Sequence, residues 1–194
     1  MSQHLEHTEA NDDVRNVAGH KIRVLYDEAA IADRVKAIAK AIASEEMDRL
    51  LVIPILKGSF IFAADLLRAL HREGLLLEVD FMMLSSYGEG TASSGEVRIL
   101  RDIESDVTGR PVILIDDILE SGRTLAFAKD LIMARGAELV RTCVFLDKPA
   151  NREVGLDADF CGVSCPDLFV VGYGMDMGHA FRELPYVGVV ESSA

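Results

Sequence analysis

Residues 112–125 read VILIDDILESGRTL, and they carry the clearest indication of the fold. Four apolar residues lead into the adjacent carboxylates Asp116 and Asp117, and Gly122 then precedes an apolar helical pattern. The apolar residues predict a short strand buried on both faces, as in a parallel sheet. In an open α/β sheet, ligands bind beyond the carboxyl ends of the strands, so the segment predicts a binding site at such an end.

The turn after this strand offers two kinds of binding group. Gly122 lets the backbone turn tightly, and the N–H groups at the start of a helix lack intrahelical partners, so they form an anion site suited to a phosphate. Ser121 and Thr124 add hydroxyl donors, whereas the paired carboxylates accept hydrogen bonds from the vicinal hydroxyls of a ribose. The segment therefore predicts a ribose 5-phosphate site. Taken alone, it leaves open a plain strand–turn–helix corner with solvated acids.

Helical and strand patterns alternate along most of the chain. Helices are expected over 28–44, with Asp27 as N-cap, from about 59 to just before Gly74, and from Gly122 to Gly136. Strands are expected over residues 50–56, 76–85, 97–100, 112–115, 139–146, 169–173 and 187–190. Residues 85–95, rich in Gly and Ser, predict a mobile loop between two strands of an edge hairpin. This order predicts an α/β fold with a central, mainly parallel sheet flanked by helices, and with the last 45 or so residues folded back as a small lobe.

Composition narrows the class of protein. A length of 194 residues with 49% hydrophobic residues indicates one domain, expected over 14–194 after a flexible tail at 1–13. The net charge of -12 disfavours nucleic acid and anionic lipid as partners. Three cysteines and no signal-peptide pattern favour the cytoplasm, and no apolar run is long enough to cross a membrane. Cys161 and Cys165 are expected to be buried apolar thiols, with a zinc site as the weaker alternative.

Residues 112–125 resemble the phosphoribosyl-pyrophosphate (PRPP) motif of type I phosphoribosyltransferases. The resemblance spans about residues 20–190 and points to the hypoxanthine-guanine branch of that family. Segment by segment, it matches the pyrophosphate loop at 55–59, the mobile catalytic loop at 85–88, the purine-contacting lysine at 147–149, the base-binding strand at 166–176 and the C-terminal stretch at 182–189.

The resemblance implies the type I phosphoribosyltransferase fold, with a small hood lobe formed by the terminal segments. It implies a purine salvage enzyme that transfers 5-phosphoribosyl from PRPP to N9 of hypoxanthine or guanine, giving IMP or GMP and pyrophosphate. Mg²⁺ is the implied cofactor, and a homodimer or homotetramer is the implied assembly. A cis peptide between Leu56 and Lys57 is a further expectation.

The resemblance also implies roles for individual residues. PRPP is expected to be held by Asp116, Asp117, Ser121, Gly122, Arg123 and Thr124. Pyrophosphate is expected to be held by Lys57, Gly58 and Arg182, with Ser86 and Tyr87 closing over it. The purine is expected to be held by Lys148, Phe169, Val170, Met175 and Asp176. Magnesium is expected to be held by Asp176, Asp116 and Asp117.

Several of these residues have chemical reasons behind their roles. Lys148 would donate to O6 of the purine and so separate 6-oxopurines from adenine, and Phe169 would stack on the base. Met175 would cover the other face. Each residue taken singly also has an ordinary structural alternative: Phe169 as core, Lys148 as a surface lysine, and Asp176 or Arg182 as solvated charges.

The sequence departs from the usual family pattern at three positions. Glu120 stands where the family usually has aspartate, the proposed general acid/base facing N7 of the purine, and it is one methylene longer. Ser121 replaces the commoner threonine, and Gly174 lies in the base-binding loop.

The rival functions are a phosphoribosyltransferase for xanthine or a pyrimidine, a PRPP-sensing regulator that binds nucleic acid, and a non-catalytic relative.

Overall fold

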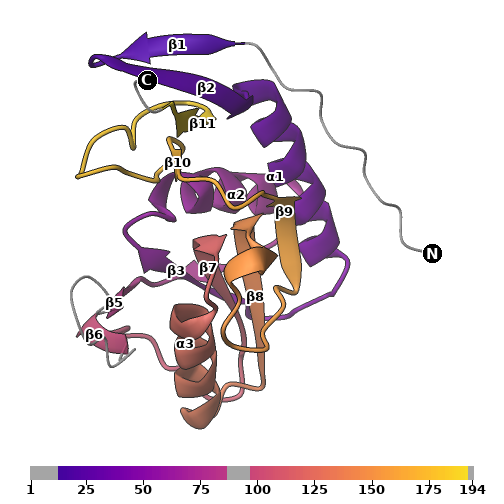
Figure 1. The fold of residues 1–194 in the computed structure, drawn as a ribbon. Helices are drawn as coiled ribbons and strands as arrows, with labels where there is room; N and C mark the ends of the chain where they lie inside the picture. The colour runs from indigo at the N-terminus through magenta and orange to yellow at the C-terminus, as the bar shows by residue number, and fades with distance from the viewer. Residues whose placement is uncertain (1–12, 87–96, 192–194) are drawn as a thin grey trace.

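The computed structural model describes residues 13–86 and 97–191, and these build two sheets (Figure 1). The larger, seven-stranded sheet follows the strand order β6-β5-β3-β7-β8-β9, and β4 also pairs with β3. All its pairings are parallel except the antiparallel pair β5–β6. The strands are β3 (Leu51–Leu56), β4 (Glu78–Val79), β5 (Met82–Ser86), β6 (Val97–Arg101), β7 (Pro111–Leu119), β8 (Leu139–Asp147) and β9 (Phe160–Ser164). The predicted mainly parallel α/β fold is confirmed.

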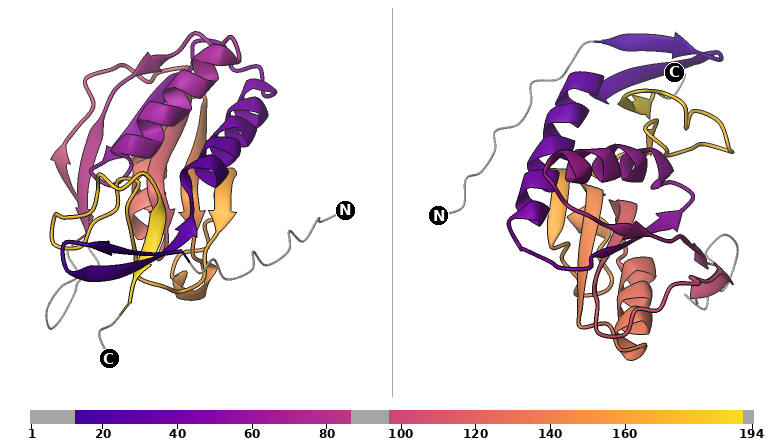
Figure 2. Two further views of the ribbon diagram at one scale, coloured as in Figure 1. Left: turned by 90° about the horizontal axis from the view of Figure 1, so that it is seen from above. Right: turned by 180° about the vertical axis from the view of Figure 1, so that it is seen from behind.

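Helices cover both faces of this sheet (Figures 1 and 2). On one face, α1 (Glu28–Ala43) and α2 (Phe60–Arg72) pack in one core cluster that includes Val52 of β3. On the other, α3 (Arg123–Ala134) packs in a cluster that includes Leu51 and Ile53. Successive residues of a strand point to opposite faces, so the uninterrupted apolar run of β3 buries both sides. The three helices lie close to their predicted positions.

Local sequence explains the bounds of the first helix. The Asp27 side chain accepts a hydrogen bond from the backbone N–H of Ala30 at 2.8 Å, which caps the first turn of α1. The apolar residues at helical spacing, from Ile31 to Ile42, are all buried. The predicted N-cap and buried face are therefore confirmed.

The second sheet has four antiparallel strands and joins the two ends of the described chain (Figure 1, top). Its strand order is β1 (Val14–Val17), β2 (His20–Tyr26), β11 (Val187–Val190) and β10 (Val170–Val171). Ile22 and Val24 of β2 are buried against Val171 and Phe181. Strands β1, β2 and β9 were not predicted, because charged, polar or small residues interrupt their apolar residues.

Three strand predictions differ in extent from the structure. The strand expected over 76–85 is interrupted between β4 and β5, where the Asp80 carboxylate accepts the backbone N–H groups of Glu104 at 2.7 Å and Ser105 at 2.8 Å. Both parts keep the same parallel register with β3. β7 runs past the predicted 112–115 as far as Leu119, since its pairing with β8 continues to that residue. The strand expected over 169–173 is reduced to the two residues of β10.

The three cysteines differ in their exposure to solvent. Cys143 and Cys165 are buried, but Cys161 is exposed on the edge strand β9, so the expectation that it is buried is wrong.

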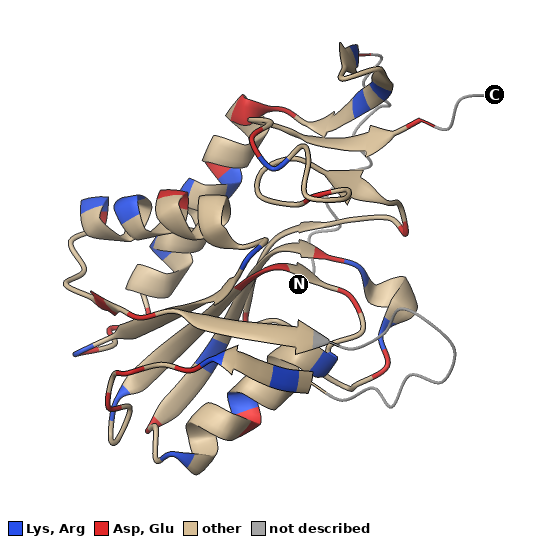
Figure 3. Cartoon of the chain, turned by 90° about the vertical axis from the view of Figure 1, so that its left-hand side faces the viewer, with Lys and Arg blue, Asp and Glu red and all other residues tan. Residues whose placement is uncertain are grey.

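Lys and Arg are interspersed with Asp and Glu over the described residues (Figure 3). No helix in residues 13–86 or 97–191 combines the length and apolar character needed to cross a bilayer. Residues 1–12 of the tail predicted over 1–13 and most of the loop expected over 85–95 lie outside the described residues.

Candidate functional site

Two neighbouring carboxylates lie at the carboxyl end of β7. The backbone N–H of Asp117 donates to Asp116 Oδ1 at 3.0 Å. Burial, with the charge of Asp117 added, raises the pKa of Asp116 well above its ordinary value. Burial also raises the pKa of Asp117. The two carboxylates therefore bring several acceptor oxygens close together, and the surrounding groups offset little of their negative charge.

The turn after β7 leads directly into α3. Gly122 adopts a left-handed φ of 84°, and no side chain caps the helix that follows. Ser121 Oγ lies 3.4 Å from the backbone nitrogen of Arg123. A cavity of about 190 Å³ is lined by residues of β7, the turn and α3, namely Asp116, Ile118, Leu119, Glu120, Ser121, Gly122, Thr124 and Leu125. The uncapped helix start thus opens next to Asp116, as a ribose 5-phosphate site requires.

A second loop approaches β7 from the side. Lys57 and Gly58 follow β3, and the Leu56–Lys57 peptide is cis. A Cβ atom on Gly58 would lie 1.9 Å from Asp117 Oδ2, and one on Gly174 would lie 2.1 Å from the Gly58 carbonyl oxygen. Three segments distant in sequence therefore meet, and each of these two contacts includes a glycine that leaves no room for a side chain.

Arg182 and Asp176 form one unit beside these glycines. The Arg182 guanidinium pairs with Asp176 Oδ1 at 2.6 Å, and it also donates to the backbone carbonyl of Gly174 at 2.6 Å. The other oxygen of Asp176 accepts the backbone N–H of His179 at 2.7 Å. The alternative in which both residues are solvated charges is wrong, because each is engaged with the loop that carries Gly174.

The predicted purine residues divide into buried and exposed members. Lys148 is buried, with 5% of its surface exposed, and its Nζ donates to the Leu168 carbonyl at 2.7 Å. Phe169 is 60% exposed and therefore is not a core residue. Val170 lies in β10, next to it. Met175 is 4% exposed and packs in the core with α1 and α2, so its contact with one face of a base stays a prediction.

Glu120 lies exposed at the end of β7 and borders a larger cavity. Its Oε1 accepts a hydrogen bond from Asn151 Nδ2 at 3.1 Å. This cavity, of about 550 Å³, is lined by Glu120, Ser121, Ala150, Asn151, Arg152 and Glu153. Because Glu120 and Ser121 also line the smaller cavity, the two spaces adjoin at the turn. Arg123, whose side chain forms an ion pair with Glu153, faces the same region.

Two predicted residues cannot be placed with the others. Ser86 ends β5 and its backbone pairs with Val97, whereas Tyr87 lies outside the described residues. Sequence reasoning missed Asn151 and Arg152, which follow Lys148 in the short 3-10 helix η1 (Pro149–Asn151) and just after it. No pattern marks them; only their position next to a residue already singled out could have drawn notice.

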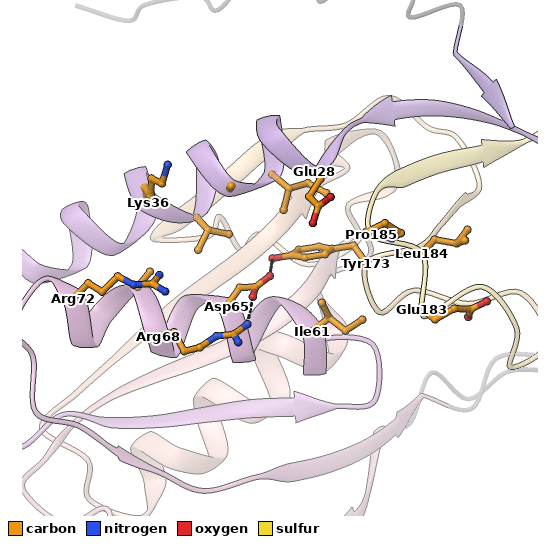
Figure 4. A pocket seen from close by; sticks show the side chains of 14 residues that line it. Glu28, Lys36, Ile61, Asp65, Arg68, Arg72, Tyr173, Glu183, Leu184 and Pro185 are labelled. Carbon is orange, nitrogen blue, oxygen red and sulfur yellow. Dashed lines mark hydrogen bonds and ion pairs between the residues drawn. The ribbon is translucent and has the colours of Figure 1, made fainter.

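Tyr173 was also missed as an anchor of the base-binding loop. It is buried, has a positive φ of 51°, and donates its hydroxyl to Asp65 Oδ2 of α2 at 2.9 Å (Figure 4). Burial and the Asp65 carboxylate raise the pKa of Tyr173, so the hydroxyl remains a donor at neutral pH. The contact lines a separate cavity of about 510 Å³ between α1, α2 and the C-terminal segment. It ties the loop that carries Gly174 and Asp176 to the helix that follows Gly58.

Comparisons with known proteins agree with this arrangement. A family model described as "Phosphoribosyl transferase domain" matches residues 23–177. A hypoxanthine-guanine phosphoribosyltransferase of Aquifex aeolicus is 43% identical over 180 residues, which cover 92% of this chain and 99% of that protein. One of Bacillus subtilis is 42% identical over 170 residues, covering 87% and 93%. The structure of a hypoxanthine phosphoribosyltransferase from Staphylococcus aureus is similar with a TM-score of 0.81 and 36% identity, covering 87% of this chain and 91% of that one.

Proposed function

This chain belongs to the phosphoribosyltransferase family, and from that membership we propose that it transfers 5-phosphoribosyl from PRPP to N9 of hypoxanthine or guanine. The products are IMP or GMP and pyrophosphate, as in purine salvage. The observation that carries the proposal is the end of β7, where two partly buried carboxylates are followed at once by the uncapped start of α3.

The ribose 5-phosphate moiety is assigned to this end of β7. Asp116 and Asp117 accept hydrogen bonds from the ribose hydroxyls, whose donors relieve the unfavourable burial of these acceptors. The backbone from Ser121 to Thr124 holds the 5-phosphate, because unpaired N–H groups and the helix dipole favour an anion there. The bond to C1′ then breaks through an oxocarbenium-like state while the ribose is held in place.

The pyrophosphate leaving group is assigned to the adjoining loops. Lys57 and Gly58 present backbone and charge, and Arg182 supplies a planar fork of donors for phosphate oxygens. Asp176, with Asp116 and Asp117, offers the oxygen ligands that Mg²⁺ prefers, and the raised pKa of the Asp116–Asp117 pair reflects a negative charge that a cation would offset. When bound, Mg²⁺ neutralises charge on the pyrophosphate.

The purine is assigned to the region between Lys148 and Glu120. Lys148 donates to O6, which excludes adenine because its 6-amino group is itself a donor. Phe169 offers an exposed ring for stacking, and the Val170 carbonyl accepts from N2 of guanine. Glu120 moves the proton at N7 as the base attacks C1′.

The remaining elements of the proposal concern the whole protein. Residues 14–194 act as one domain in which the four-stranded sheet serves as a hood, and Ser86 with Tyr87 excludes water from the pyrophosphate. The protein works in the cytoplasm as a homodimer or homotetramer. The interspersed charges of Figure 3 disfavour the rival in which the fold binds nucleic acid, since that function requires a basic face.

A spectrophotometric assay with PRPP, Mg²⁺ and either hypoxanthine or guanine tests the proposal. We expect IMP or GMP with matching release of pyrophosphate, and no AMP from adenine. Xanthine and a pyrimidine base in parallel reactions separate the rival substrates. If neither hypoxanthine nor guanine yields a nucleotide, the proposed function is wrong.

A further inference from the structure

The side chain of Asn151 lies between two carboxylates that come from different segments. Its Nδ2 lies 3.1 Å from Glu120 Oε1, at the end of β7, and 2.8 Å from Asp167 Oδ1, two residues before Phe169. An amide nitrogen carries two hydrogens and can serve both oxygens, whereas the amide carbonyl would repel them. One side chain therefore connects Glu120 to the segment that presents Phe169.

The backbone around Asn151 is fastened to the end of β7 on both sides. Before it, the Lys148 N–H donates to the Leu119 carbonyl at 2.9 Å. After it, the N–H groups of Glu153 and Val154 donate to the Ser121 carbonyl at 3.0 and 3.1 Å. The short Asn151 side chain thus projects from a fixed base directly opposite Glu120.

Arg152 adds a side-chain attachment to the same turn. Its guanidinium donates to the backbone carbonyl of Glu120 at 2.7 Å and forms an ion pair with Asp147 at the end of β8. Arg152 therefore holds the backbone of Glu120, while Asn151 holds its carboxylate. The two contacts fix different parts of one residue.

We propose that Asn151 is a positioning residue for Glu120, holding its carboxylate toward the purine. This inference rests on the proposed function, in which Glu120 moves the proton at N7. A glutamate arm has more rotatable bonds than an aspartate arm, and a misplacement of about 1 Å can cost on the order of 100-fold in rate. The donated hydrogen bond removes that freedom, and the bridging N–H groups also offset the repulsion between the two carboxylates.

The length of residue 120 makes the pairing specific to this chain. Aspartate would shorten the arm by one carbon–carbon bond, about 1.5 Å. The contact of 3.1 Å would then open beyond the range of an N–H···O hydrogen bond. Glu120 and Asn151 therefore form a matched pair, and a substitution at either position should cancel the benefit of the other.

A double-mutant cycle on the full chain tests the pairing. The variants are Asn151→Ala, Glu120→Asp and the double variant, and the single-turnover rate of IMP formation is measured with PRPP, Mg²⁺ and hypoxanthine. We expect Asn151→Ala to slow the rate about 10-fold in the unmodified chain, and less than about 2-fold beside Glu120→Asp. The KM for PRPP should change less than about 2-fold. Asn151→Gln, which keeps the amide donor, should restore part of the rate.

Asp157→Asn, an exposed substitution in the same connection between β8 and β9, is the matched control and should leave the rate within about 2-fold. Thermal melting of each variant separates loss of folding from loss of positioning. The inference is overturned if Asn151→Ala has no effect, or if it slows the rate equally in both backgrounds. If the unmodified chain makes IMP, either of these results leaves the proposed function intact. If the unmodified chain makes no nucleotide, both the inference and the proposed function are overturned.

Discussion

At the scale of single residues, the carboxylates at the end of β7, to which we assign the ribose hydroxyls, carry a cost in stability. The folded state raises the pKa of Asp116 above its value in the unfolded chain, so the folded state binds more protons between those two pKa values. Stability therefore falls as pH rises through that window, and the penalty is fully present above it. Such a penalty is typical of a residue kept for function.

Asp116→Asn should reveal this penalty. Without PRPP and Mg²⁺, the variant should melt at a higher temperature than the unmodified chain at pH 7, and the difference should shrink as pH falls toward the ordinary aspartate pKa. Its kcat/KM for PRPP should drop about 10- to 100-fold, because a hydrogen bond to a charged group is worth about 1.5–3 kcal/mol. Calorimetry across pH and steady-state kinetics measure the two effects; a lower melting temperature at pH 7 would contradict the first.

Glu120→Gln tests the proton transfer directly. The amide keeps the size of the side chain but cannot take up the proton, so kcat should fall on the order of 100-fold or more while the KM for PRPP changes little. The measurement is a rate profile from pH 5 to 10 for both proteins. Near-full turnover of the variant at every pH would remove Glu120 from the mechanism.

At the scale of elements, the site depends on close approach between loops that follow different strands. The loop after β3 reaches Asp117 of β7, and the loop before β11 reaches Gly58, because neither glycine carries a side chain. Parallel strands bring their carboxyl ends to one edge of the sheet, so these loops meet although their residues are far apart in sequence.

Gly58→Ala should therefore disrupt the site. A Cβ atom would lie 1.9 Å from Asp117 Oδ2, so the loop or the carboxylate must move. We expect kcat/KM for PRPP to fall at least about 100-fold, since displacement by about 1 Å has that order of effect. Gly155→Ala, where a Cβ atom would meet nothing within 4 Å, is the matched control and should keep activity within about 2-fold. Equal activity of both variants would show that this contact is dispensable.

At the scale of the whole molecule, the hood sheet and the larger sheet are joined through buried side chains. Tyr173 packs its ring against Phe145 of β8, with ring centroids 5.0 Å apart, and donates its hydroxyl to Asp65 of α2. Tyr173 lies only two residues after the end of β10, a strand of the hood sheet. The residue thus connects the small sheet to the main core.

Tyr173→Phe keeps the ring and removes the hydroxyl. It should lower the free energy of unfolding by about 1–2 kcal/mol, because Asp65 loses a partly buried donor, and the melting temperature should fall by a few degrees. Tyr26→Phe is the control, since the Tyr26 hydroxyl donates to the Ser164 carbonyl in an exposed position and should cost less than about 0.5 kcal/mol. Equal melting temperatures of the two variants would contradict the importance of the Asp65 contact.

The sheet class, the three helices and the β7–α3 turn could be predicted from the sequence. These features depend on local order: an apolar run buries a strand on both faces, Asp27 caps α1, and Gly122 permits a left-handed turn. The resemblance then supplied the purine and pyrophosphate residues, which no periodicity or spacing could assign.

Which side chains meet became known only from the folded structure. It placed Met175 in the core and Phe169 at the surface, although both lie in one apolar segment. It joined strands from the two ends of the chain into one sheet, and it set Asn151 between Glu120 and Asp167. The physical reason is that such contacts link residues from about 15 to more than 150 positions apart, which share no local pattern, and their geometry is fixed only when the sheets and helices pack.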